Sequence, residues 1–268
     1  MQKLLAVLLL CWLASSGVRA AESGLFPSRT WDIRQFQASG IFPSPPFFAI
    51  AQSKDGLIYV GDNLGLLEFD GRTWRRLPIE LNSAVTLIGS TRSGGLVVGG
   101  NEILMVFPDV RDLSRSIDVA AALEGGFHGS GEFWEIAEDD AQWCVRSTAL
   151  LVCSDKDGFW KLRTKTGYGR IFSGRNSIYL QEDGVGLLRV GMRALKPMPG
   201  AEQFADIGIY SLTESPESNI TAVTRTPQAI WRWNALESPG PPNMIDSSQP
   251  GNAHRYWHSI RNRQNYPA

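Results

Sequence analysis

The sequence predicts an all-β protein, specifically an incomplete β-propeller of four-stranded blades in which about four to five blades are visible. Three observations support this prediction. The chain of 268 residues contains 27 glycines and 10% aromatic residues, a composition typical of a turn-rich β-protein. Short apolar runs are closed by Asp-Gly and Gly-Gly pairs, which favour tight turns between strands. These runs also recur at a nearly constant spacing along the chain.

The clearest repeat unit lies between residues 50 and 77. Ile50–Gly61 is interpreted as a strand, an Asp-Gly turn and a second strand. Gly65–Gly71 supplies a third strand and another Asp-Gly turn, and Thr73–Leu77 supplies a fourth strand. Four short strands with this turn chemistry are expected to form one propeller blade.

Further units of the same kind start near residues 88, 136, 171 and 222. Counted from residue 50, the spacings are 38, 48, 35 and 51 residues. Propeller repeats are about 40–50 residues long, so the period fits this architecture. A single blade is too thin to bury both of its faces and therefore requires neighbours. We assign residues 21–231 to the propeller segment.

Residues 1–20 have the pattern of a secretory signal peptide. A basic start is followed by the ten-residue apolar run Leu4–Leu13, and Val18 and Ala20 match the small residues before a cleavage site. An uncleaved anchor is the alternative, but a spanning helix needs about 20 apolar residues. We expect cleavage after Ala20, a periplasmic or secreted location, and no stable membrane span after cleavage.

Removal of residues 1–20 takes away two basic residues and leaves a net charge of −3. This charge and the absence of a basic run argue against nucleic-acid binding. Two cysteines remain, Cys144 and Cys153. If a turn at Thr148-Ala149 joins two strands, these cysteines face each other, and an oxidising compartment permits a disulfide. Two free, packed thiols are the alternative.

The segment Leu57–Trp74 reads LIYVGDNLGLLEFDGRTW, which resembles the two-component regulator propeller repeat. The resemblance is close over residues 50–80 and weaker at the later units. It implies an extracytoplasmic sensor propeller of the kind found in hybrid histidine kinases and diguanylate cyclases. In that family a transmembrane helix and an output domain usually follow the propeller.

The chain departs from the family pattern in two respects. The family typically has many more repeats, and the fifth unit here fails after Ile230-Trp231, where a glycine corner is expected. Residues 229–268 instead contain five of the 15 prolines and no lysine. A reading-frame change in a truncated sensor and a genuine proline-rich tail are both consistent with this break. We expect residues 232–268 to be disordered or frame-shifted.

No catalytic set, metal site or cofactor-binding motif is recognised, so we expect a protein that is not an enzyme and needs no cofactor. Aromatic residues near the starts of inner strands border the expected channel mouth, where an unknown small ligand or an envelope protein would bind. The candidate ligand-binding residues are Trp31, Phe47, Phe48, His128 and Trp134.

Three functions remain open at this point. The first is a sensory, ligand-binding propeller of a bacterial signal-transduction protein without its output domain. The second is an exported propeller enzyme, such as a lyase or lactonase, and the third is an envelope protein-interaction module. Four to five blades leave open strand edges, so self-association is also expected.

Overall fold

The computed structural model describes residues 46–244, except 80, 82, 226–227 and 235–242. The chain divides into two units, Met1–Gln37 and Ala38–Ala268, and all described residues belong to the second. The expected signal peptide (1–20), Trp31 and most of the expected tail therefore lie outside the described residues.

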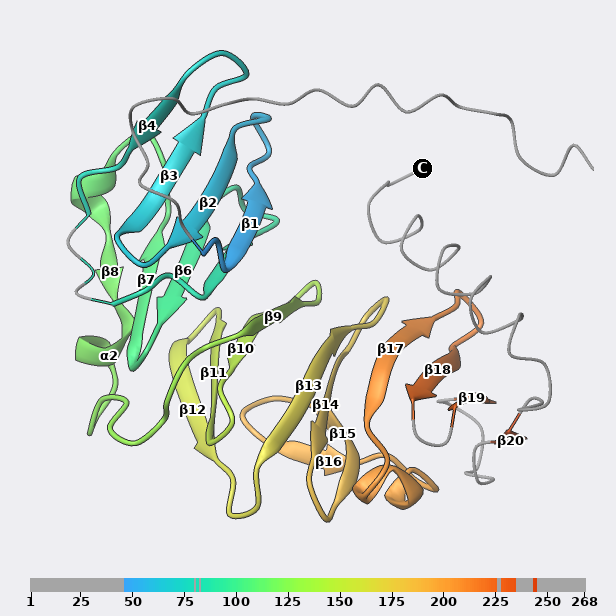
Figure 1. Cartoon of the computed structure of the whole chain (residues 1–268). Coiled ribbons are helices and arrows are strands. Elements are labelled where there is room, and N and C mark those ends of the chain that lie inside the picture. Colours follow the sequence, from blue (N-terminus) through green and yellow to red (C-terminus); the bar gives the residue numbers. More distant parts are fainter. Residues whose placement is uncertain (1–45, 80, 82, 226–227, 235–242, 245–268) are drawn as a thin grey trace, which may run out of the picture. The chain divides into compact units, whose positions relative to one another are not determined.

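The described residues form five antiparallel sheets of four strands each, which follow one another in chain order (Figure 1). The first sheet contains β1 (Ala49–Gln52), β2 (Ile58–Asp62), β3 (Gly65–Phe69) and β4 (Trp74–Arg76). The second contains β5 (Leu87–Ser90), β6 (Leu96–Gly100), β7 (Ile103–Phe107) and β8 (Ile117–Asp118). The third contains β9 (Glu135–Glu138), β10 (Trp143–Arg146), β11 (Leu150–Asp155) and β12 (Gly158–Arg163).

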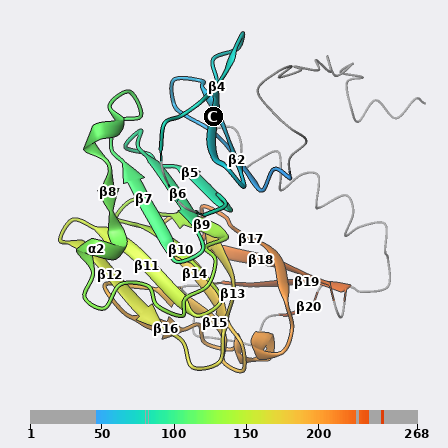
Figure 2. The ribbon, with the colours of Figure 1, turned by 60° about the vertical axis from the view of Figure 1, so that its left-hand side comes forward.

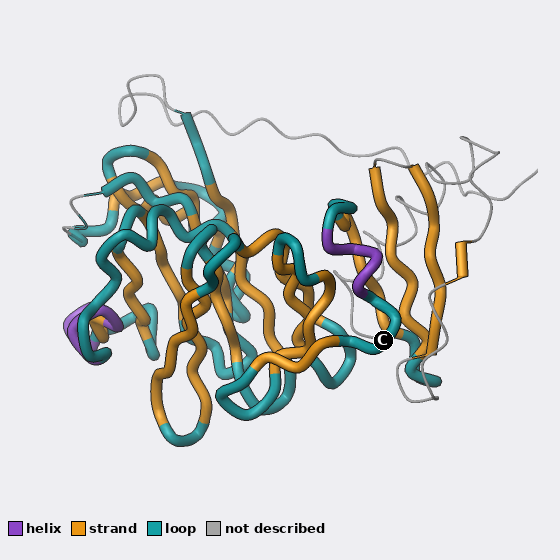
Figure 3. Tube along the Cα trace, turned by 90° about the horizontal axis from the view of Figure 1, so that it is seen from below, coloured by secondary structure: helices purple, strands orange, loops and turns teal. Residues whose placement is uncertain are grey.

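The last two sheets have the same order of strands. The fourth contains β13 (Tyr168–Ser173), β14 (Ile178–Glu182), β15 (Gly186–Val190) and β16 (Leu195–Pro197). The fifth contains β17 (Ile209–Glu214), β18 (Asn219–Arg225), β19 (Gln228–Asn234) and β20 (Asn243–Met244). Among the described residues, helix is confined to the short segments η1 (Leu113–Arg115), α2 (Val119–Ala122) and η2 (Glu202–Ala205), and Figure 3 draws helices in purple. The predicted all-β fold of four-stranded blades is confirmed.

A five-residue turn joins the first two strands in three of the sheets. In the first sheet the Leu57 amide donates to Ser53 Oγ and the Gly56 amide donates to the Ser53 carbonyl. The Ser53 amide in turn donates to the Leu57 carbonyl at 2.8 Å. Gly56 has a φ of 85°, a left-handed conformation that glycine adopts without steric cost. The turns at 91–95 and 215–219 have the same hydrogen bonds, with a hydroxyl residue first and a left-handed residue fourth.

The predicted start of the fifth unit at residue 222 is wrong. Ala222 lies within the second strand, β18, and Ile230-Trp231 lies within the third, β19. The sheet begins with β17 at Ile209, which the sequence pattern missed because the following turn has Ser218 where the first two sheets have glycine. The first strands therefore begin at residues 49, 87, 135, 168 and 209.

The apparent break in the repeat after Trp231 lies inside a strand. Strand β19 continues to Asn234, three residues beyond the expected end of the propeller segment. Trp233 is buried, and its ring lies 5.6 Å from that of Phe204. A glycine corner was expected after Ile230-Trp231 because these residues were assigned to a second strand. They belong to the third strand, so the absence of glycine there does not mark a break in the repeat.

Consecutive sheets pack through their first strands, which are the inner strands of the blades. Strands β1 and β5, β5 and β9, β9 and β13, and β13 and β17 are in contact, and Figure 2 shows the same succession from another direction. At the second of these contacts, Ile136 lies against Gly89 so closely that a Cβ added there would be 2.7 Å from the isoleucine side chain. The apolar clusters extend from one sheet to the next, so each sheet is stabilised by its neighbours.

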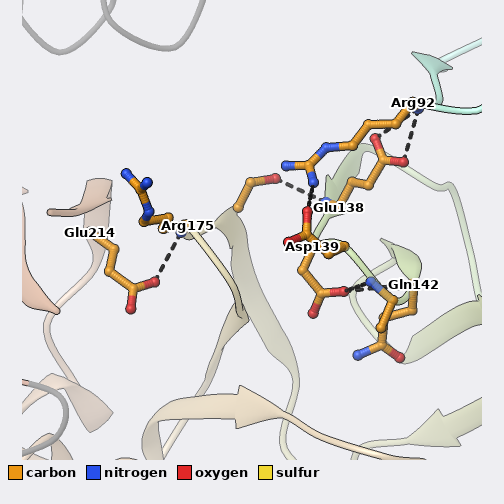
Figure 4. A network of polar contacts seen from close by, with 9 residues as sticks. Arg92, Glu138, Asp139, Gln142, Arg175 and Glu214 are labelled. Atoms are coloured by element: carbon orange, nitrogen blue, oxygen red, sulfur yellow. Dashed lines mark hydrogen bonds and ion pairs between the residues drawn. The ribbon is translucent and has the colours of Figure 1, made fainter. Parts of the chain in front are cut away.

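Polar groups also link neighbouring sheets at the ends of the inner strands (Figure 4). The carboxylate of Glu138 accepts hydrogen bonds from the Arg92 amide at 2.9 and 3.2 Å, and the Glu138 amide donates to Ser173 Oγ at 2.9 Å. Glu214 accepts from the Arg175 amide at 2.9 Å in the same way. Turn amides of one sheet are thus satisfied by the side chain that ends the inner strand of the next.

The two cysteines lie directly opposite each other on β10 and β11, as the predicted strand pairing requires. A disulfide joins Cys144 and Cys153, and both side chains are fully buried. None of the helices in the described part of the chain has the length and apolar content needed to cross a bilayer.

Candidate ligand-binding site

Three of the expected channel-mouth aromatics lie immediately before inner strands. Phe47 and Phe48 precede β1 and are 55% and 43% exposed. Trp134 precedes β9 and is 45% exposed, and its amide donates to the Arg146 carbonyl at 3.1 Å. The prediction that these residues border inner strands is therefore consistent with the structure, whereas their role in binding stays a prediction.

His128 lies in a different place from the one expected. It belongs to the loop between α2 and β9, and its side chain is 96% exposed. Its carbonyl accepts a hydrogen bond of 2.7 Å from Arg163, which lies on β12, the strand of the third sheet farthest from the inner strand. The loop runs from the outer edge of the second sheet to the inner strand of the third, and His128 occupies its outer part. It is not a residue of an inner strand.

A surface pocket of about 510 Å³ lies between the fourth and fifth sheets. Its lining comes from the neighbouring inner strands β13 and β17, from the end of β14 and from the end of η2 with the segment that follows it. Figure 1 shows the positions of β13, β14 and β17 in the fold. The lining residues are Gly169, Arg170, Gln181, Asp183, Ala205, Asp206, Gly208, Ile209 and Tyr210.

Both inner strands at this pocket carry a β-bulge at the same position. The register of β13 against β14 shifts between Tyr168 and Ile171, which leaves one additional residue in β13. The register of β17 against β18 shifts between Ile209 and Ser211, so Tyr210 is the additional residue there. A bulge redirects side chains away from the regular alternation of a strand. Here the two bulges supply Arg170 and Tyr210 to the pocket.

Glu135 holds the guanidinium group of Arg170 in place. Oε1 of Glu135 accepts from Arg170 Nε at 2.8 Å, and Oε2 accepts from Arg146 Nη2 at 2.9 Å and from the Ile171 amide at 3.2 Å. The carboxylate thus joins three strands, β9, β10 and β13. Trp134, one of the candidate residues predicted from the sequence, directly precedes Glu135, the residue that orients Arg170.

The fifth sheet contacts the same guanidinium group. Nη1 of Arg170 donates to the Tyr210 carbonyl at 3.1 Å, and the guanidinium carbon lies 5.9 Å from the centroid of the Tyr210 ring. A cation over an aromatic face in this range is attracted to the ring. Among the described residues, Nη2 of Arg170 has no hydrogen-bond partner, so it is available to a bound molecule.

Gln181 fixes the opposite wall of the pocket. Its side chain is buried, and Nε2 donates to the carbonyls of Phe204 and Ile207, each at 2.8 Å. Its Oε1 accepts from the Ile209 amide at 3.1 Å. The buried amide thus uses both of its donors and its acceptor oxygen to hold the segment 204–209 against β14, which forms this wall of the pocket without a ligand.

Two carboxylates complete the lining. Asp183 and Asp206 are exposed, and within the described part of the chain neither carboxylate has a hydrogen-bond or ion-pair partner. The chain segments that carry them are adjacent, since the Gly184 amide donates to the Ala205 carbonyl at 3.1 Å, and both aspartates line the pocket. No set of three or more histidine, cysteine or acidic residues among the described residues is arranged to hold a metal ion.

The sequence prediction did not include Arg170, Glu135 or Tyr210. A bulge has no strong local signature, and Arg170 and Glu135 are separated by 35 positions. The only available sequence signal was the irregular alternation in Tyr168–Ser173, where Gly169-Arg170 interrupts the apolar pattern.

Comparison with solved structures identifies propellers of several functions. The extracellular domain of a hybrid two-component system, BT4673 from B. thetaiotaomicron, is 16% identical with a TM-score of 0.51, and the match covers 75% of this chain. The chain spans 28% of that protein's length. A virginiamycin B lyase from Staphylococcus aureus, solved as a catalytically inactive histidine-to-alanine variant, is 13% identical with a TM-score of 0.52. That match covers 76% of this chain and 71% of the lyase.

YCF48 from Cyanidioschyzon merolae is 12% identical with a TM-score of 0.51, and the match covers 74% of this chain and 70% of YCF48. No protein-family model and no curated protein sequence matches the chain. These likenesses establish a propeller-like fold that is shared by sensor domains and by a lyase.

Proposed function

We propose that this chain is an extracytoplasmic, ligand-binding propeller that senses a small molecule for a bacterial signal-transduction system of the two-component or diguanylate cyclase type. The observation that carries the proposal is the pocket between β13 and β17, in which Arg170 is held ready by Glu135 and Tyr210. A pre-formed pocket with a few oriented polar groups is the usual form of a small-molecule site.

The sensory role is supported by two further points. The sequence of residues 57–74 resembles the repeat of two-component regulator propellers. The fold is shared with the extracellular domain of BT4673, a hybrid two-component system. The pocket lies between two blades, so a ligand that contacts both would favour one relative arrangement of the fourth and fifth sheets. That rearrangement would be the signal passed to a partner or an output domain.

An exported lyase is the competing function, because a virginiamycin B lyase has the same fold. That enzyme is inactive when one histidine is replaced by alanine. The described part of this chain has one histidine, His128, and it lies beside the outer strand β12. The arrangement therefore favours binding without a reaction over a lyase of this kind.

A screen of the purified chain by thermal denaturation, against a library of sugars, amino acids, short peptides and organic acids, tests the proposal. We expect at least one class to raise the melting temperature in a concentration-dependent manner, because a ligand that binds only the folded state stabilises it. Recovery of that ligand unchanged after prolonged incubation would agree with a sensor. Its conversion, or stoichiometric bound metal in the purified protein, would favour the enzyme.

A further inference from the structure

We propose that the pocket between β13 and β17 binds a small zwitterion, meaning a free amino acid or a short peptide with both an ammonium and a carboxylate group. This inference rests on the proposed ligand-binding function and specifies the chemical class of the ligand. It follows from the distribution of charge over the two walls of the pocket.

The wall formed by the inner strand of the fourth sheet is positive. One carboxylate, that of Glu135, lies between two guanidinium groups, those of Arg146 and Arg170, at 2.9 and 2.8 Å. The group of three side chains therefore has a net charge of +1. Arg146 is largely buried, with 13% of its side chain exposed, whereas Arg170 is 44% exposed and lines the pocket. The positive charge is consequently presented to a ligand by Arg170.

The other wall is negative. Asp183 follows β14 and Asp206 follows η2, and both carboxylates line the pocket. Neither has a cationic partner among the described residues, so their charge is not neutralised by the protein. An ammonium group placed between them would gain two charge-assisted hydrogen bonds. Arg170 Nη2 would donate to the carboxylate of the same ligand.

The position of Tyr210 argues against a neutral sugar as the ligand. Sugar-binding sites commonly use an open aromatic face, but here the guanidinium group of Arg170 already lies over the ring of Tyr210 at 5.9 Å. Stacking of a sugar on that face would displace Arg170 from its bonds to Glu135 and to the Tyr210 carbonyl. The geometry therefore favours a ligand that pairs with the guanidinium group instead of replacing it.

Isothermal titration calorimetry with the full chain tests this proposal. The probes are the twenty standard amino acids, glycylglycine and triglycine, together with the amide and the N-acetyl derivative of the best ligand. We expect at least one probe to bind with a Kd of about 1 mM or tighter, and both derivatives to bind about tenfold or more weakly, since each lacks one charge. Equal binding of the zwitterion and its derivatives would overturn the proposal.

Matched variants locate the site. Arg170→Gln and the double variant Asp183→Asn/Asp206→Asn should each weaken binding about tenfold or more. Arg189→Gln, an exposed arginine of β15 outside the pocket, and Asp157→Asn, an exposed turn aspartate, should leave binding within about twofold. The aspartates have no partner that folding requires, so the double variant remains informative even if Arg170→Gln is unstable. Unchanged binding in that double variant would contradict the inference.

The outcome also separates this inference from the proposed function. If a sugar or an organic acid binds and Arg170→Gln abolishes its binding, the ligand-binding function stands and the zwitterion is excluded. If no class of small molecule binds, both proposals fail.

Discussion

Ser218 is one of three non-glycine residues with a positive φ in the described part of the chain, at 60°. It occupies the fourth position of the turn between β17 and β18, where the equivalent turns of the first two sheets have Gly56 and Gly94. A residue with a Cβ in this conformation costs about 1–2 kcal/mol, whereas glycine does not pay this cost. The fifth sheet therefore contains a small, correctable strain at a single residue.

We expect Ser218→Gly to increase the free energy of unfolding by about 0.5–1 kcal/mol, because relief of strain exceeds the additional entropy of glycine in the unfolded chain. Urea denaturation of the two proteins measures this difference. The matched control is Gly94→Ser, where an added Cβ meets no atom within 4 Å and φ is 91°. That variant should be less stable than the wild type, and a stabilised Gly94→Ser would refute the explanation.

The environment of Asp62 alters the pKa of its carboxyl group, and this leads to a second prediction. Burial works to raise the pKa of its carboxyl group, but the bonds from Arg76 at 2.7 and 3.0 Å and from the Leu64 amide at 2.8 Å prevail, and the pKa is held below its ordinary value of 3.8. A carboxyl group with a lowered pKa stabilises the folded state at any pH above 3.8, and this stabilisation is lost as the pH falls through the lowered value.

Asp62→Asn should therefore cost about 2 kcal/mol of stability at pH 7, because Arg76 loses its charged partner. The difference between wild type and variant should become smaller as the pH is lowered below 3.8, the ordinary pKa of this group, which chemical denaturation at a series of pH values will show. A pH-independent difference would mean that the charge of Asp62 does not contribute.

At the scale of the elements, the same strand position has a different environment in different sheets. Ile50 on β1, Ile88 on β5 and Ile171 on β13 are equivalent, since each lies third from the last residue of its inner strand. Ile88 and Ile171 are 7% and 6% exposed because a preceding sheet covers them, whereas Ile50 is 72% exposed. How much the isoleucine at this position contributes to stability therefore depends on whether a neighbouring sheet covers it, and not on its own strand.

We expect Ile171→Ala to cost about 2–4 kcal/mol and Ile50→Ala less than about 0.5 kcal/mol. Guanidinium denaturation of the two variants in parallel measures both changes. Equal costs would show that the face of β1 that carries Ile50 is covered in solution.

The β10–β11 hairpin contains the disulfide, which closes a short loop with a sequence separation of 9 residues. Loop-closure entropy for a loop of this length corresponds to about 2–3 kcal/mol of stability. Dithiothreitol should reduce this disulfide and thereby lower the urea concentration at the midpoint of unfolding of the wild type. The Cys144→Ala/Cys153→Ala variant provides the control, because its midpoint should not respond to the reductant.

At the scale of the whole molecule, export and oxidation are linked. A buried disulfide forms readily in the periplasm and is rare in the cytosol, and residues 1–20 have the signal-peptide pattern. Produced from its complete gene in a Gram-negative host, the chain should be recovered from the periplasm with Ala21 as its first residue and no free thiol. Intact mass spectrometry before and after alkylation measures both properties, and a cytoplasmic product that begins at Met1 would disprove the export prediction.

The packing of sheet on sheet also bears on the proposed binding site. Each sheet packs on its neighbours, and the candidate site lies between two sheets and not within one. A ligand there would bridge the fourth and fifth sheets, so its binding depends on their relative position. This arrangement agrees with the proposed sensory role, in which binding would be coupled to movement of the two sheets.

The amino-acid sequence was sufficient to predict the four-stranded repeat, the starts of the first four units to within three residues, and the strand register that places Cys144 opposite Cys153, while it left open whether a disulfide joins them. These features depend on neighbouring residues, because turn chemistry and the two-residue alternation of strands are local. The start of the fifth sheet was missed because Ser218 occupies the turn position at which the first two sheets have Gly56 and Gly94.

The candidate site required the tertiary structure. Arg170 of the fourth sheet bonds Glu135 of the third sheet and the Tyr210 carbonyl of the fifth sheet. Each of these contacts joins residues that are 35 or more positions apart in the sequence. The bulges that direct Arg170 and Tyr210 into the pocket are set by how β13 and β17 pair with β14 and β18. Local sequence determines where a strand begins and turns, but side chains from separate blades meet only where the packing of one sheet against the next brings them together.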